Sequence, residues 1–132
     1  MKYFINNKKD RAFIVSPEYG IGWYTQHAQK YPECATDPEL VGLVLEYQTL
    51  IAESKDRRSK PEVREAAQKN VEFLKTRIEQ YASYLWKDGF WKADGLRVEW
   101  APEHSIVRYS DLDGAETVVI QPMYASGSLI IA

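Results

Sequence analysis

Hydrophobic residues recur at steps of three or four along residues 61–87, the longest stretch of the chain with a sustained helical period. Residues at this spacing lie on one face of an α-helix, and most positions between them are charged or carry amides. The pattern therefore predicts an amphipathic helix that buries one stripe against the rest of the protein. This stripe consists of Val63, Ala67, Val71, Leu74, Ile78, Tyr81 and Leu85.

A second helix is predicted upstream, over about residues 36–52. Thr36 and Glu39 have the spacing of a capping box, and Pro38 stands in the first turn, where proline is tolerated. The apolar face of this helix consists of Leu40, Leu43, Val44, Tyr47, Leu50 and Ile51. A charged connector at residues 55–60 follows, so we expect an antiparallel pair of helices. The basic residues of the connector could touch phosphate, but such a run is more often a solvated turn.

Both ends of the chain carry short runs that are typical of strands. Residues 3–5 and 12–15 flank a polar turn and predict a hairpin. In the stretch from Leu96 to Trp100 the apolar and charged residues alternate, which predicts a strand with one buried face. Residues 105–109 and 117–121 flank a turn-forming Asp-Leu-Asp-Gly sequence and predict a second hairpin.

The register of that second hairpin is open. A two-residue turn at Asp113 and Gly114 would pair Tyr109 with Val118, but it would also place Asp111 opposite Glu116, and like charges across a ladder are unfavourable. A four-residue loop would avoid this repulsion. The apolar run at residues 128–132 either completes the sheet or meets another subunit.

Strand pairs at both ends with two helices between them define an α+β fold. We expect two layers, a mainly antiparallel sheet built from both chain ends and packed on two antiparallel helices. A length of 132 residues suits a single domain over residues 1–132.

Composition narrows the class of protein. The net charge of −2 gives no field that would mark a nucleic-acid or membrane-surface binder, so we expect neither partner. Cys34 is the only cysteine, which fits a reducing cytoplasm. The start of the chain lacks the apolar segment of a signal peptide, and no apolar run approaches the length of a membrane span.

Few residues suggest catalysis. Gly20 and Gly22 match two glycines of a dinucleotide fingerprint, but Thr25 replaces the third. Cys34 and His27 could form a nucleophile and a base, but a lone cysteine is more often a small buried apolar residue. Two histidines without spaced carboxylates do not form a metal signature. We therefore expect no catalytic residue, no metal and no cofactor.

The least ordinary local sequence is the stretch at residues 19–27, where two glycines lie among large aromatics. Two interpretations are open: the aromatics pack in the core around a bulge, or they form a loop-held recognition surface. For the second, the candidate binding residues are Tyr19, Gly20, Gly22, Trp23, Tyr24 and His27.

Residues at both ends of the chain match a sequence pattern of other small proteins. They are Tyr19, Gly20, Gly22 and Trp23, then Val98, Glu99, Trp100, Pro102 and Glu103, and finally Tyr109, Asp113, Gly114 and Glu116. In this pattern the chain resembles small uncharacterised proteins carried by bacteriophages and prophages. The resemblance implies an accessory gene of a mobile element that acts in the bacterial host cell, and it implies no catalytic residue.

Three functions remain as hypotheses. The first is a non-enzymatic protein that binds a host protein, such as an inhibitor of a defence protein. The second is a small-molecule or nucleotide-binding domain or enzyme that uses the glycine-aromatic loop, in which Trp23, Tyr24 and His27 would line a concave pocket. The third is a structural subunit of a phage particle. The C-terminal strand could also support a homodimer.

Overall fold

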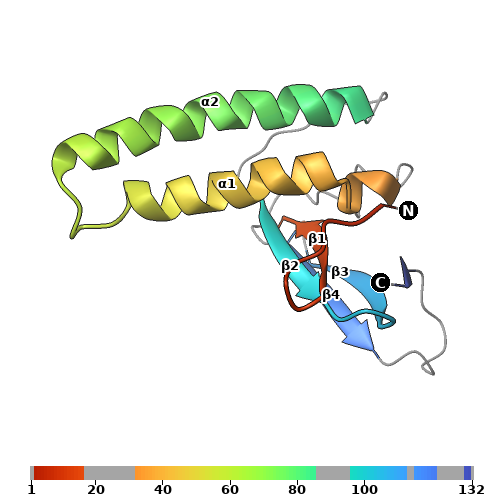
Figure 1. Cartoon of the computed structure of the whole chain (residues 1–132). Helices are drawn as coiled ribbons and strands as arrows, with labels where there is room; N and C mark the ends of the chain where they lie inside the picture. Colours follow the sequence, from red (N-terminus) through yellow and green to blue (C-terminus); the bar gives the residue numbers. More distant parts are fainter. Residues whose placement is uncertain (1, 17–31, 86–95, 113–114, 122–129, 132) are drawn as a thin grey trace.

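A computed structural model describes residues 2–16, 32–85, 96–112, 115–121 and 130–131 of the chain. Within these ranges the fold is α+β with two packed helices and antiparallel strands, as the sequence predicts (Figure 1). The described strands form two small sheets, where the sequence predicts one. The elements are β1 (Arg11–Val15), the 3-10 helix η3 (Pro32–Ala35), α1 (Pro38–Ser54), α2 (Pro61–Leu85), β2 (Arg97–Ala101), β3 (Ile106–Leu112), β4 (Ala115–Gln121) and β5 (Ile130–Ile131).

Helix α1 begins one residue later than a cap at Thr36 would place it. Asp37 is the N-cap, because its side chain accepts a hydrogen bond of 3.0 Å from the backbone N–H of Leu40. Thr36 is instead fully buried in the turn after η3, where its backbone N–H donates to the carbonyl of Glu33. The predicted capping box is therefore wrong in its cap residue, although the predicted helix is present.

Helix α2 runs antiparallel to α1 and buries most of the predicted stripe (Figure 1). The buried side chains are Ala67, Val71, Leu74, Ile78 and Ala82. Val63, predicted to be buried, is 41% exposed. The reason is length, because α2 has 25 residues against 17 in α1 and its first turns extend past the end of α1 (Figure 1).

Strand β1 joins the two ends of the chain by pairing with β2, with Ile14 opposite Val98. Four consecutive residues of β1, Ala12 to Val15, are buried, so this strand is covered on both faces. The hairpin predicted at the N-terminus is short: an isolated bridge joins Ile5 to Arg11, and beside it the backbone N–H of Ala12 donates to the carbonyl of Phe4. The alternation predicted in β2 is confirmed, since Leu96 and Val98 are buried while Arg97 and Glu99 are exposed.

The second hairpin, β3–β4, adopts the register of the two-residue turn. Tyr109 is opposite Val118, and Asp111 is opposite Glu116. This register also aligns the apolar cross-strand pairs Val107 with Ile120 and Tyr109 with Val118, and such pairs are each worth roughly 0.2–1 kcal/mol. On the other edge of β3, Val107 pairs with Ile130 of β5, so the C-terminal run completes this sheet.

Helix α1 lies between α2 and the strands (Figure 1). Its Gln48 side chain accepts a hydrogen bond of 2.8 Å from the backbone N–H of Val98, which fixes α1 to β2. The two sheets are joined where the Tyr109 hydroxyl of β3 donates to the carbonyl of Ile14 in β1. Helix α2 is thus the outer layer of the helical part.

Candidate functional site

The binding residues suggested by the sequence lie outside the described residues. Tyr19, Gly20, Gly22, Trp23, Tyr24 and His27 all fall within residues 17–31. They remain a prediction from the sequence.

Cys34 is a core residue with no exposed surface. Burial, followed by the negative charges of Glu33 and Asp37, raises the pKa of its thiol to about 12. A thiol needs to ionise to act as a nucleophile, and this one stays protonated at neutral pH. The environment of Cys34 therefore supports a structural role.

The connector between the helices folds as a local turn. Asp56 accepts from the backbone N–H of Arg58 at 2.9 Å and pairs with its guanidinium at 3.4 Å. The arrangement favours the interpretation of a solvated turn over that of a phosphate site.

His104 also lies in an exposed turn. Its backbone is left-handed, with φ 65°, and its imidazole is 3.4 Å from the carboxylate of Glu103, which also pairs with Arg11 at 3.2 Å. Among the residues that the structure describes, no three His, Cys, Asp or Glu side chains are grouped so that they could hold a metal ion. This turn therefore carries a small group of polar side chains at the surface, joined by the ion pair of Arg11 and Glu103.

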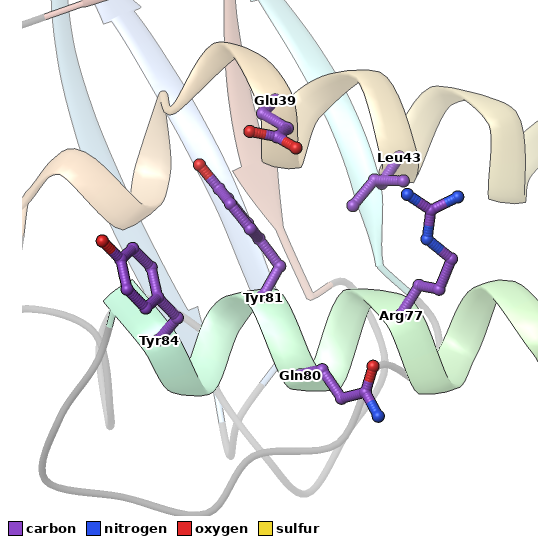
Figure 2. Close-up of a pocket in the computed structure, with 6 residues that line it drawn as sticks. All are labelled: Glu39, Leu43, Arg77, Gln80, Tyr81 and Tyr84. Carbon is purple, nitrogen blue, oxygen red and sulfur yellow. The ribbon is translucent and has the colours of Figure 1, made fainter.

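A pocket of 280 Å³ lies between α1 and α2 (Figure 2). It is open to solvent, and its volume lies just below the roughly 300–1,000 Å³ range of small-molecule sites. The lining residues are Glu39 and Leu43 from α1 and Arg77, Gln80, Tyr81 and Tyr84 from α2.

Tyr81 connects this pocket to the start of α1. Desolvation, then the Asp37 carboxylate and then the Glu39 carboxylate raise the pKa of the Tyr81 phenol, so its hydroxyl stays protonated and can donate. Figure 2 shows the Tyr81 ring rising from α2 toward Glu39. The Tyr84 ring lies beside it, with ring centroids 6.3 Å apart. One end of the pocket is thus aromatic and acidic, while Arg77 and Leu43 lie at the other end (Figure 2).

The flank of α2 beside the pocket exposes two large aromatic side chains. Phe73 is 64% exposed and Tyr84 is 75% exposed. Phe73, Arg77, Gln80 and Tyr84 follow one another at steps of four, three and four, so they share one side of the helix. We call this flank, together with the pocket, the groove face.

Sequence reasoning missed the groove face because Phe73 and Tyr84 are not members of the predicted stripe. The sequence did contain one indication, because Phe73 and Tyr84 lie outside an apolar stripe that already runs the length of the helix. An aromatic residue outside the buried arc of an amphipathic helix is either a second packing contact or a surface anchor.

No helix of the described residues is both long enough and apolar enough to span a membrane. No protein-family model matches the chain, and no curated protein or solved structure is significantly similar to it.

Proposed function

We propose that this protein is a non-enzymatic binding protein and that its partner protein contacts the groove face. The observation that carries the proposal is the exposure of Phe73 and Tyr84 on one flank of α2, next to an open pocket. Aromatic side chains are enriched at the centres of protein interfaces, where they provide large contact areas with few rotatable bonds. A pair of them on a rigid helix is already ordered for binding, which lowers the entropic cost of association.

The resemblance to phage and prophage proteins supports a host protein as the partner. A mobile element gains from a small product that covers a functional surface of a host protein, such as a defence protein. Inhibition of this kind needs affinity and shape and requires no catalytic residue. The groove face provides a rigid helical surface for it.

The proposal can be tested by capture of the partner from a lysate of the bacterial host, with the tagged chain as bait and mass spectrometry as readout. We expect Phe73→Ala/Tyr84→Ala to lose the partner, because removal of an interface anchor costs about 2 kcal/mol or more. The unfolding midpoint should stay close to that of the wild type, since both side chains are mostly exposed.

The matched control is Ile5→Ala/Ile120→Ala, which removes two exposed apolar side chains from the strand part of the molecule. This control should retain the partner. A partner held equally well by the Phe73→Ala/Tyr84→Ala variant would show that the groove face is not the binding surface.

A further inference from the structure

An acidic edge borders the groove face on the α1 side. Glu39, Glu46 and Glu53 are seven residues apart and are all exposed. Seven residues make almost two helical turns, so the three carboxylates form a row with steps of roughly 10 Å. Leu43 and Leu50 lie between them in the sequence, on the side turned toward the core, and both are partly buried.

The α2 side of the groove has a different character. Its exposed apolar side chains are Phe73 and Tyr84, and Arg77 is the cation that lines the pocket. The groove thus combines an apolar wall with an acidic edge, while the net charge of the whole chain is only −2. The negative charge at this edge is a local feature of the surface.

We propose that the groove face receives a basic amphipathic helix of the partner protein. This inference rests on the proposed function, because it names the chemistry of the partner that the groove face binds. Apolar residues of the incoming helix pack on Phe73 and Leu43, and its lysine or arginine residues pair with Glu46 and Glu53. Helices commonly bind in this way, with one apolar face set into a groove.

The pocket provides a place for one cation of that helix. A lysine or arginine head between the Tyr81 and Tyr84 rings and Glu39 meets two aromatic faces and a carboxylate together. Cations bind favourably over aromatic faces. The open volume of 280 Å³ leaves room for the aliphatic stem of the side chain.

Charge complementarity also distinguishes this occupant from a second copy of the chain. A copy docked through the same face brings its own acidic edge, and like charges across an interface oppose association. Each carboxylate of the acidic edge attracts a basic helix. The affinity should therefore decrease with added salt, which screens this attraction.

The test uses two synthetic amphipathic helical peptides with identical apolar positions, one with lysine and one with glutamate at every charged position. Fluorescence anisotropy with the full chain measures their affinities at low and at raised salt. We expect the lysine peptide to bind, with an affinity that salt weakens, and the glutamate peptide not to bind. Phe73→Ala/Tyr84→Ala should lose the lysine peptide.

Two charge variants locate the binding surface. Glu46→Gln/Glu53→Gln should weaken the lysine peptide about fivefold, the scale of two exposed ion pairs. The matched control, Glu65→Gln/Glu72→Gln, also removes two exposed carboxylates seven residues apart, but from another side of α2. It should change the affinity less than about twofold, since a pair away from the groove is largely screened.

The possible results separate the two proposals. Equal weakening by both charge variants, or equal binding of both peptides, overturns the basic-helix inference. If neither peptide binds but Phe73→Ala/Tyr84→Ala still loses the captured host protein, the inference fails and the proposed function stands. A dimer in sedimentation of the chain alone that dissociates in this variant would show that a second copy occupies the groove, and would overturn the inference.

Discussion

Burial determines the chemistry of Cys34. Its thiol has no exposed surface, and the carboxylates of Glu33 and Asp37 further disfavour the thiolate, so the pKa is raised to about 12. The same burial makes the thiol a poor target for oxidation or alkylation. Packing in the core is enough to explain the presence of this cysteine, without a catalytic role.

The raised pKa predicts a pH dependence of stability. The folded thiol keeps its proton up to about pH 12, whereas the unfolded thiol releases it near the ordinary value of 9.0. Its contribution to the free energy of unfolding is therefore complete below pH 9 and is lost as the pH rises toward 12. Denaturation of the wild type and of Cys34→Ala across this range measures the difference, which should shrink with rising pH. A constant difference would show that the thiol ionises equally in both states.

At the scale of elements, the two sides of α2 differ in burial. Its buried stripe packs mainly on α1, and its flank carries the exposed aromatics of the groove face. Leu74 and Ile78 are almost fully buried on the first side, while Val63 is 41% exposed near the start of the helix. Substitutions along a single helix should therefore have very different effects on stability.

We expect Leu74→Ala or Ile78→Ala to lower the free energy of unfolding by about 2 to 5 kcal/mol, because each truncates a large buried aliphatic side chain. Val63→Ala serves as the control and should cost less than about 1 kcal/mol. Chemical denaturation measures all three. Wild-type midpoints for both core variants would mean that the stripe is not part of the core.

The sequence predicts the helices well because their periodicity reports local geometry directly. The stripe from Ala67 to Ile78 is buried as expected, and β2 alternates as expected. Which strands pair is harder to predict from the sequence, because a period of two shows that a segment is a strand but not which strand lies beside it. Strand β1 forms a full ladder with β2, which is far along the chain, and only one bridge with the segment just before it. The β3–β4 register could not be read from the sequence either, because the sequence allowed both a two-residue turn and a four-residue loop, and the structure shows the register of the two-residue turn.

At the scale of the whole molecule, the strands near the two ends of the described chain hold the helical pair in place. Strands β1 and β2, from the two ends of the chain, pair with each other. Gln48 of α1 accepts a hydrogen bond from β2, and Tyr109 of the second sheet donates one to β1. The groove face exists only in this assembly, because it is formed by one edge of α1 and one flank of α2. For that reason the sequence alone does not predict that these residues lie close together.

The most direct test of the central claim, that a partner protein covers the groove face, is hydroxyl-radical footprinting of the chain with and without the captured host protein. This measurement reports the exposure of individual side chains. We predict that oxidation of Phe73 and Tyr84 falls sharply in the complex, while oxidation of Ile5 and Ile120, which are also exposed in the free chain, stays the same. Unchanged oxidation of Phe73 and Tyr84 in a complex that protects other parts of the chain would contradict the account.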